Sequence, residues 1–438
     1  MTMRNVLYMG LASAALLFAA SCSKPQQAAA TSTTFGENPT LVEPVPQTVP
    51  TTKTATPVGW AEGAAPTVAE GFTVTRFAEG MTHPRWMFIL PNGDMLVSQS
   101  ATRASAGLSN IAANIVMKSV GAIAPSPNDI VLLRDTDGDG VADKSSVFIA
   151  GLTQPFGMAL IGNAIYVANT NSVVRFPYKE GDTEIKAPAE KVADLPFKEG
   201  ANGHWTRNLL AKSDGSKLYV TVGSASNIGD KGMEAENGRA AIHEMNPDGT
   251  GQRIFASGLR NPNGLAWEPT TGALWTTVNE RDLLGDNLVP DYMTSVKDGG
   301  FYGWPYSYYG DHVDSRVQPQ KPELVAKATK PDYALGAHTG TLGLAFYSGT
   351  TFPAHYQGGA FIGQHGSWNR SEPAGYKVIF VPFANGKPSG PPEDILTGFL
   401  NAKGEAQGRP VGVAVDKKGA LYVADDVGNV IWRVTPKG

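Results

Sequence analysis

The feature that most constrains the fold of this chain is a pattern that occurs six times along it. Each copy has a start rich in Pro, Gly or Asn, a short apolar strand, a turn containing Asp, Asn or Gly, and a second apolar strand. The copies begin at Pro84, Pro155, His204, Arg260, Thr341 and Arg409. Two apolar strands joined by a tight turn match the inner strands of a propeller blade. The repeat therefore predicts an all-β protein, a six-bladed β-propeller.

Closure of the ring is also predicted. Residues 72–77 alternate between apolar and polar side chains and precede the first copy. We expect them to lie beside residues 430–434 as the outermost strand of the last blade. The 50 glycines and 31 prolines suit a chain of many short strands joined by turns.

The chain before the repeats divides into two parts. Residues 1–22 match an export signal, with an apolar run over 6–20 that ends in Ala-Ala-Ser before Cys22. Small residues leading into the single cysteine favour a lipoprotein site, so that Cys22 would carry a lipid anchor; an ordinary secretory signal is the alternative. Either interpretation predicts an exported, periplasmic protein. Residues 23–68, rich in Ser, Thr, Pro, Ala and Gln, are interpreted as a flexible tether, and 69–438 as the propeller.

Propeller geometry gathers the starts of the innermost strands around one mouth of the central channel. The residues expected there are Arg85, Phe156, His204, Arg260 with Asn261, the 338–341 loop and Arg409. Three arginines at the same repeat position predict an anion site, because Arg can donate two parallel hydrogen bonds to a carboxylate. The net charge of −4 gives no reason to expect nucleic acid as a partner.

Several segments carry a resemblance to a known family. GHWTRNL, GLRNPNGLAW, VNERD, YGWP, HGSWNR and GRPVGVAVD occur in this order between residues 203 and 416. They resemble the sorbosone and glucose dehydrogenases that use pyrroloquinoline quinone (PQQ), and the PQQ domain of fungal pyranose dehydrogenases. The resemblance implies an enzyme that binds PQQ and Ca²⁺ and oxidises an aldose, sorbosone or similar sugar aldehyde or hemiacetal. No haem or flavin motif is present, which implies a separate electron acceptor, a cytochrome or a quinone.

The resemblance also implies roles for individual residues. His204 matches the base that takes the substrate proton, and Arg260 matches the cation that stabilises the developing alkoxide. Asn261 would hydrogen-bond the quinone. The glucose enzymes place an aspartate behind the histidine, whereas this chain has Ser224 at that position, and a serine cannot stabilise imidazolium as a carboxylate does. What orients His204 is therefore an open question.

The remaining cofactor positions come from the later blades. The backbone carbonyls of Glu280 and Arg281 match the calcium ligands of the family, although a charged turn without metal is the alternative. The other residues implied to contact PQQ are Arg85, His365, Trp368, Asn369, Arg370 and Arg409.

A separate motif lies at residues 135–143. Asp135, Asp137, Asp139 and Asp143 have the spacing of a calcium loop, with glycine at the sixth position. Ser146 stands where an EF-hand has its bidentate Glu, and a strand rather than a helix precedes the loop. A structural Ca²⁺ site and an unmetallated turn both fit this sequence.

Two further functions compete with the dehydrogenase. A propeller hydrolase or lactonase would need carboxylates and asparagines converging on a channel metal. A non-enzymatic, lipid-anchored binding propeller gives no reason for arginines and a histidine to share one mouth. The Arg, His and Asn residues at the strand starts favour the dehydrogenase, although the fold alone permits all three functions.

Overall fold

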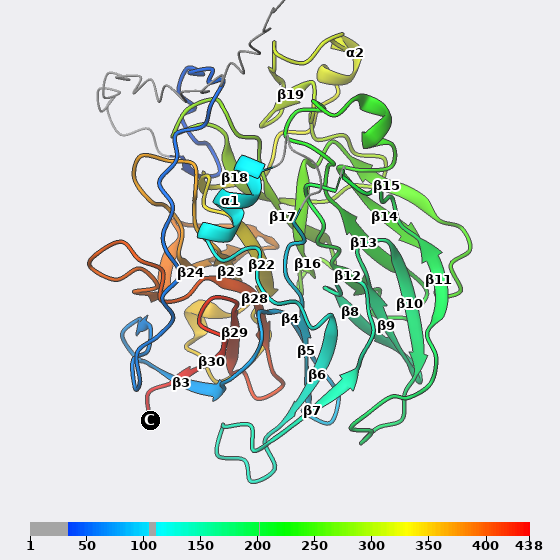
Figure 1. Cartoon of the computed structure of the whole chain (residues 1–438), viewed down its shortest axis with the longest axis vertical. Helices are drawn as coiled ribbons and strands as arrows, with labels where there is room; N and C mark the ends of the chain where they lie inside the picture. Colours follow the sequence, from blue (N-terminus) through cyan, green and yellow to red (C-terminus); the bar gives the residue numbers. More distant parts are fainter. Residues whose placement is uncertain (1–33, 105–110, 201) are drawn as a thin grey trace, which may run out of the picture. The chain divides into compact units, whose positions relative to one another are not determined.

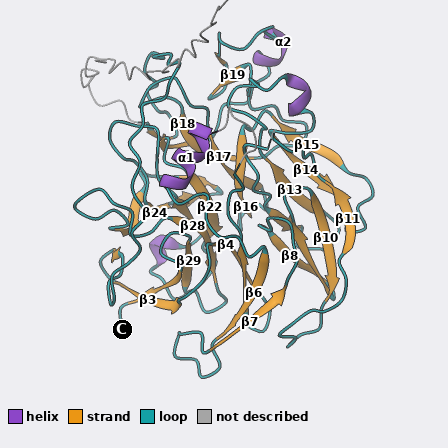
Figure 2. Ribbon diagram, in the orientation of Figure 1, coloured by secondary structure: helices purple, strands orange, loops and turns teal. Residues whose placement is uncertain are grey.

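The computed structural model describes residues 34–104, 111–200 and 202–438, and its main elements are short antiparallel strands. They form six sheets of four or five strands, each built from one copy of the repeat (Figures 1 and 2). The first three blades contain β4 (Pro84–Ile89), β5 (Met95–Gln99), β6 (Asp129–Arg134) and β7 (Lys144–Ile149); β8 (Met158–Ile161), β9 (Ala164–Ala168), β10 (Ser172–Pro177) and β11 (Glu190–Asp194); and β12 (Leu209–Ala211), β13 (Leu218–Val222), β14 (Ala241–Met245) and β15 (Arg253–Ser257).

The last three blades follow the same order. They contain β16 (Asn261–Trp267), β17 (Leu274–Asn279), β18 (Pro290–Ser295) and β21 (Tyr333–Ala337); β22 (Thr341–Phe346), β23 (Ala360–Gln364), β24 (Lys377–Val381) and β27 (Glu393–Thr397); and β28 (Pro410–Val415), β29 (Leu421–Asp425), β30 (Val430–Pro436) and β3 (Phe72–Ala78). The innermost strands contact one another in the order β4, β8, β12, β16, β22, β28 and back to β4. The predicted six-bladed propeller is therefore confirmed.

The predicted closure of the ring is also observed. Strand β3 pairs antiparallel with β30, with Val74 opposite Val434. The last blade thus combines three strands from the end of the chain with one strand that precedes the first blade. The pairing supplies the outermost strand of the last blade and closes the ring by hydrogen bonds.

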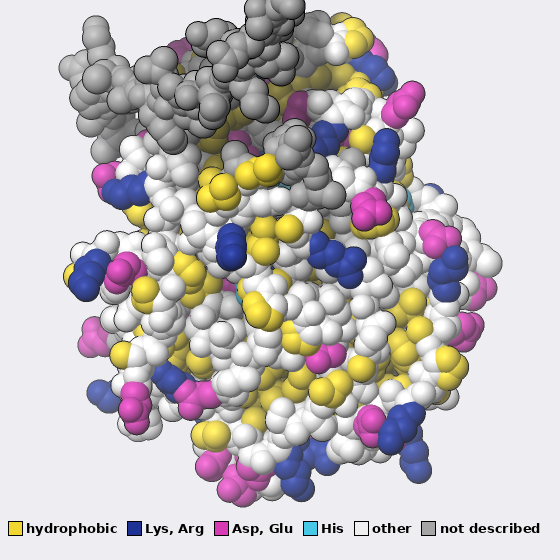
Figure 3. Space-filling model, viewed as in Figure 1, with side chains coloured by type: hydrophobic (Ala, Val, Ile, Leu, Met, Phe, Trp, Pro, Cys, Tyr) yellow, Lys and Arg dark blue, Asp and Glu magenta, His cyan; other side chains and the backbone are white. Residues whose placement is uncertain are grey.

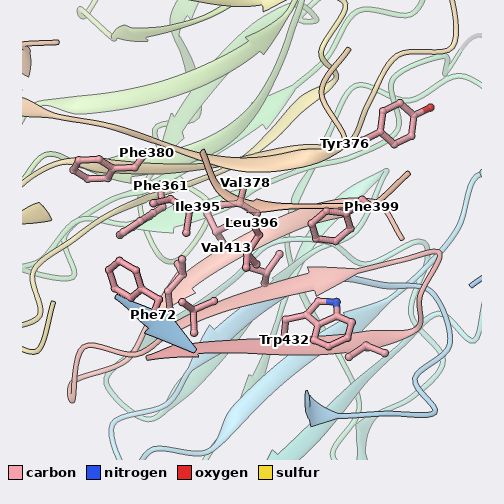
Figure 4. Packing of buried hydrophobic residues seen from close by; sticks show 14 of the residues in the cluster. Phe72, Phe361, Tyr376, Val378, Phe380, Ile395, Leu396, Phe399, Val413 and Trp432 are labelled. Carbon is pink, nitrogen blue, oxygen red and sulfur yellow. The ribbon is translucent and has the colours of Figure 1, made fainter. Parts of the chain in front are cut away.

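Blades pack face to face, which explains the weak alternation of the inner strands in the sequence. Every residue of β5, β9 except its first, and β13 is buried. Figure 4 shows the core between the fifth and sixth blades, where Phe361 and Phe380 face Phe72 and Val413 across the layer, with Trp432 further along. Strands covered on both faces need apolar side chains on both, so the period of two is lost.

Short elements occupy the connections. They are α1 (Ile111–Ser119), α2 (Pro322–Val325), the 3-10 turns η2 (Met233–Glu236) and η3 (Ala354–Tyr356), and the two-residue strands β19 (Ser307–Tyr308), β20 (His312–Val313), β25 (Phe383–Ala384) and β26 (Lys387–Pro388). Within the described residues, no helix combines the length and apolar character needed to cross a bilayer.

The segment before the propeller differs from the flexible tether expected over residues 23–68. Residues 1–33, including Cys22, lie outside the described residues. From residue 34 onward the chain lies against the blades: β1 (Phe35–Gly36) pairs with β21, and β2 (Thr67–Val68) pairs with β27. The Trp60 indole N–H donates to Asp425 at 2.7 Å. Apolar residues scattered among the prolines, Trp60 included, supply the burial that holds this segment in place.

The face shown in Figure 3 carries Lys and Arg side chains interspersed with Asp and Glu. This distribution matches the nearly balanced totals of 36 basic and 40 acidic residues.

Candidate active site

A cavity of about 700 Å³ lies at the mouth where the innermost strands begin. Asn114 and Met117 of α1, in the long β5–β6 connection, line one side of it, and Figure 1 shows α1 in front of the inner strands. Of the residues predicted from the sequence, those that line the cavity are His204, Arg260, Asn261, Glu280, His365, Trp368, Asn369, Arg409 and, from the 338–341 loop, His338 and Gly340. The repeat therefore predicted the location of this cavity.

His204 is the start of the third copy and is held by Ser224. Its Nδ1 lies 3.0 Å from the carbonyl oxygen of Ser224 and 2.9 Å from its Oγ. Gly223 allows this close packing, because a Cβ there would lie 2.6 Å from the His204 Cβ and would also overlap Asn261 Oδ1. Burial lowers the pKa of His204 well below its ordinary value, and the charge of Arg260 lowers it further. The imidazole is therefore neutral at neutral pH, as a proton acceptor must be.

Arg260 lies beside His204 and ties two loops together. Its Nη1 donates to the Glu280 carbonyl at 2.6 Å, while Nη2 donates to Asn227 Oδ1 at 2.9 Å and to Asp282 Oδ2 at 3.2 Å. These bonds fix the guanidinium in a buried position, where its charge acts on neighbouring groups with little screening by water. Arg260 thus supplies a fixed positive charge next to the base.

Asp282 is a site residue to which the sequence patterns assigned no role. Its carboxylate accepts a hydrogen bond from Asn369 Nδ2 at 2.6 Å and lies 3.6 Å from Nδ1 of His338. Burial raises the pKa of this carboxyl group, but the charges of Arg260 and His338 outweigh burial and hold the pKa well below its usual range. The site therefore contains a stable carboxylate opposite its arginine.

Two buried oxygens on the cavity wall have no hydrogen-bond donor among the described residues. They are Oδ1 of Asn261 and Oε1 of Glu280. Buried acceptors are normally satisfied, so each points to a donor or a cation supplied from outside the protein. Four basic side chains, Arg103, Lys231, Arg260 and Arg409, also line the cavity. Unpartnered oxygens together with cationic groups fit an acidic ligand that arrives with a hard metal ion.

His365 and Arg409 line the cavity but are bound to their surroundings. Nε2 of His365 lies 2.9 Å from Asp426, which also accepts from Arg85. The Arg409 side chain donates to the carbonyls of His365 at 2.9 Å and Gly366 at 2.8 Å. Both residues therefore shape the wall, and Arg409 contributes mainly its charge.

Phe156 and three predicted arginines do not line the cavity. Arg85 is buried between Asp426 and the rings of Phe156 and Trp205, so the expected ring of three arginines contains two at the mouth. Arg281 turns away to Asp314 and to the carbonyl of Asp282. The Arg370 Nη1 donates to the carbonyls of Asp286 and Ala337. Each guanidinium has at least one hydrogen-bond partner 33 or more positions away in the sequence, which local patterns could not reveal.

The predicted calcium ligands are placed differently from one another. Glu280 lines the cavity, but its carbonyl accepts from Arg260 Nη1. Arg281 is absent from the described residues that line the cavity. The Glu280 oxygen that lacks a partner among the described residues is Oε1 of its carboxylate, not its backbone carbonyl.

The 135–143 loop is the turn between β6 and β7, at the end of the strands opposite the cavity. Carboxylate oxygens of Asp135, Asp137 and Asp139 lie within 4.8 Å of one another. Asp135 also accepts from the backbone N–H groups of Gly138 and Gly140, and Asp143 accepts from Thr136 instead of joining the cluster. Three of the four predicted aspartates are therefore brought together.

Sequence comparisons match this chain to one protein family and to several individual proteins. The sequence profile of the TrAA12-like family matches residues 66–294 and 316–437. An uncharacterized protein of Borreliella burgdorferi is 29% identical over 292 residues, which cover 65% of this chain and 76% of that protein. The PQQ-dependent pyranose dehydrogenase of Coprinopsis cinerea is 27% identical over 295 residues, 53% of this chain and 39% of that protein. The PQQ-dependent sugar dehydrogenase of Hypocrea jecorina is 23% identical over 417 residues, 83% and 87% of the two chains.

Solved structures share the fold. The calcium structure of the Trichoderma reesei family AA12 enzyme superposes with a TM-score of 0.68 at 21% identity, covering 88% of this chain and 98% of that one. The holo PQQ domain of the Coprinopsis cinerea pyranose dehydrogenase gives 0.67 at 22% identity, covering 87% and 100%. The resemblance to PQQ-dependent sugar dehydrogenases that the sequence motifs carried is confirmed, and the chain belongs to the TrAA12-like family.

Proposed function

We propose that this protein is a PQQ-dependent oxidoreductase that oxidises a sugar at an aldehyde or hemiacetal carbon, such as an aldose or sorbosone. The observation that carries the proposal is the placement of a neutral, half-buried His204 with Arg260 at the wall of the cavity. The names of the relatives from Coprinopsis cinerea and Hypocrea jecorina support the same chemistry. The choice among sugars rests on the resemblance alone.

The protein's own residues would perform the proton chemistry. Nδ1 of His204 is held by Ser224, so Nε2 is the atom that accepts the proton of the sugar hydroxyl. The fixed charge of Arg260 stabilises the alkoxide as that proton leaves. Residues of α1 line the cavity and reduce access of water to the reacting groups. PQQ, when bound, supplies the quinone that accepts the hydride.

The residues present fit both PQQ and Ca²⁺. The cationic side chains of Arg103, Lys231 and Arg409 would face the carboxylates of PQQ. The unpartnered oxygens of Asn261 and Glu280 would contact the cofactor and its calcium ion. We therefore propose that the Glu280 carboxylate takes part in holding calcium, together with or in place of the carbonyls of Glu280 and Arg281.

Location and electron acceptor are further parts of the proposal. The leader at residues 1–22 supports export to the periplasm and a lipid anchor at Cys22. A separate cytochrome or quinone would reoxidise the cofactor. Labelling of the cells with a radioactive fatty acid, compared between wild type and Cys22→Ser, tests the anchor.

Reconstitution tests the catalytic function. Purified protein is loaded with PQQ and Ca²⁺, desalted and assayed by dye reduction with a panel of aldoses and sorbosone. We expect retained quinone absorbance and sugar-dependent turnover, and His204→Ala should retain the absorbance and lose the turnover. Loss of all quinone absorbance after desalting would refute the proposal. Lactone hydrolysis by the same preparation without PQQ would instead support a hydrolase.

A further inference from the structure

The edge of His204 that faces the protein determines which ring nitrogen can act as a base. Nδ1 lies 3.0 Å from the Ser224 carbonyl, and a carbonyl oxygen can only accept a hydrogen bond. This contact favours the neutral tautomer with the proton on Nδ1 and the lone pair on Nε2. Among the described residues, Nε2 has no hydrogen-bond partner, so the lone pair is available on the cavity wall.

The hydroxyl of Ser224 completes this arrangement. Its Oγ donates to the Ser226 carbonyl at 2.6 Å, so its only hydrogen is engaged and the oxygen is left to accept from His204 Nδ1 at 2.9 Å. Both acceptors of the histidine therefore belong to one residue. Their position depends on the conformation of the turn formed by residues 224–226.

Glu236 holds that turn from behind. Its Oε2 accepts the backbone N–H of Ala225 at 2.7 Å, and its Oε1 accepts the Ser226 hydroxyl at 2.6 Å. The side chain ends the 3-10 turn η2, is 6% exposed and is not among the residues that line the cavity. Hydrogen bonds to a buried carboxylate are short and strong, so this contact restrains the turn more than a neutral partner would.

We propose that Glu236 is a positioning residue for His204: through Ser226 and Ser224 it fixes the tautomer and orientation of the imidazole. This inference rests on the proposed function of His204 as the base. It also answers how the site works with Ser224 in place of a direct carboxylate. The carboxylate is present, but two hydrogen-bonded residues separate it from the ring, so it orients the imidazole without directly pairing with imidazolium.

Other charges near the histidine are accounted for. Burial lowers the pKa of His204, the charges of Arg260 and Arg239 lower it further, and the charge of Asp282 raises it. Nη2 of Arg239 lies 3.4 Å from the Ser224 carbonyl and 3.2 Å from that of His204. Arg239 also donates to the Ser224 carbonyl, so this carbonyl is shared between Arg239 and His204. The Ser224 hydroxyl, held through Ser226 and Glu236, is the second acceptor that favours Nδ1 as the donor.

Glu236→Gln is the central variant for the test, because it replaces one of the two accepting oxygens with an NH2 group, which cannot accept from Ala225 or Ser226. Glu268→Gln is a matched control. Glu268 is also buried and accepts from the N–H of Thr270 and the hydroxyl of Thr271, but it lies in the β16–β17 turn at the opposite end of the strands. Ser226→Ala, alone and combined with Glu236→Gln, completes a double-mutant cycle.

Nitrogen-15 spectra of the histidine side chains give a measurement that does not depend on turnover. The full-length protein contains seven histidines, and His204→Gln identifies the signal of interest. We expect wild type and Glu268→Gln to show His204 protonated at Nδ1. Glu236→Gln should show a mixture of tautomers. With PQQ and Ca²⁺ bound, Glu236→Gln should also lower kcat about tenfold, with KM and PQQ affinity within about twofold of wild type.

The outcomes separate the two proposals. A wild-type tautomer and kcat in folded Glu236→Gln would overturn the positioning role, as would an equal loss in Glu268→Gln. A further tenfold loss when Glu236→Gln is added to Ser226→Ala would show that the effect does not pass through Ser226, and would also overturn it. A tautomer change in Glu236→Gln beside a wild type that turns over no sugar would keep the positioning role and refute the proposed function.

Discussion

Asn369 Nδ2 lies 2.6 Å from Oδ1 of Asp282, and this bond joins the loop after β23 to the loop after β17. The two loops belong to adjacent blades and meet at the cavity. Asp282 also accepts a hydrogen bond from Arg260. The Asn369 amide therefore helps to hold the carboxylate that pairs with the Arg260 guanidinium. The relationship makes blade five part of the geometry around His204.

Asn369→Ala should weaken PQQ binding. The change removes the hydrogen bond that holds the Asp282 carboxylate at the cavity, and this loss of preorganisation should raise the Kd for PQQ about tenfold. Titration of quinone absorbance measures the effect. Asn401→Ala is the control, because Asn401 also donates to a carboxylate, that of Glu405, outside the cavity. Equal affinities of the two variants would show that the Asn369 contact plays no part in binding.

Val434→Ala should destabilise the fold through the closing blade. Val434 is fully buried opposite Val74, and removal of its methyl groups from a packed core should cost about 2 kcal/mol. Val147→Ala, on the exposed outer strand β7, should cost less than about 0.5 kcal/mol. Denaturant unfolding of both variants gives the comparison. If Val147→Ala lowers the free energy of unfolding as much as Val434→Ala does, the loss in Val434→Ala cannot be attributed to packing in the closing blade.

Acid should destabilise the protein between pH 6.5 and 4. Burial lowers the pKa of His83 and of His365 to about 4, against the attraction of Asp426. In this pH range the unfolded histidines bind protons and the native ones remain neutral, so the free energy of unfolding falls as pH falls, by on the order of 3 kcal/mol for each histidine. Above pH 6.5 this contribution is fully present.

Melting temperatures measured across this range provide the check. His365→Gln retains an amide donor for Asp426 and should give a shallower pH dependence than wild type. His355→Gln alters an exposed histidine paired with Glu393 and should leave the slope unchanged. A slope that is the same in all three proteins would rule out His365 as a cause of the pH dependence.

The acid limb of kcat/KM should lie well below pH 6.5. Burial and the Arg260 charge lower the pKa of His204, so the base remains unprotonated in mild acid. Arg260→Ala should move the limb to higher pH and lower kcat roughly 100-fold, since it removes charge stabilisation of the alkoxide. Arg260→Lys keeps the charge and should leave the limb near its wild-type position. A limb that does not move in Arg260→Ala contradicts this electrostatic role.

Calcium dependence should originate at the cavity and not at the 135–143 loop. That loop lies at the other end of the strands and is held by its own backbone bonds to Asp135. The double variant Asp137→Asn/Asp139→Asn should therefore lose activity to a calcium chelator over the same concentration range as wild type. A changed chelator response in the variant would connect the loop to the active site.

The inner strands and one half of the site could be predicted from the sequence. The repeat marks the starts of the inner strands, and those starts place His204, Arg260 and Arg409 at the cavity. The other half follows the second strand of each blade: Ser224 after β13, Asp282 after β17, Asn369 after β23 and Asp426 after β29. The second strand of each blade returns to the mouth, so the residues that follow it could have been predicted to lie near the cavity. Among them, Ser224 and Asn369 were identified only through the family motifs.

The errors have a common physical cause. Arg85 was expected to face a ligand, but a buried guanidinium needs an anion, and Asp426 supplies it from 341 positions away. Glu236 was missed because it lies in an irregular connection, where no period relates it to His204. Partner choice across such distances depends on three-dimensional packing that a single sequence does not encode locally.

The pairing of β3 with β30 also has a consequence for the order of events during folding. Strand β3 is synthesised before the first blade, yet its partner is among the last residues of the chain. Its backbone donors must therefore wait unpaired until almost the whole chain has emerged. The five other blades can form in succession, whereas the sixth is a late, long-range step that requires both chain ends at once. A ribosome that still holds the C-terminus would keep the ring open.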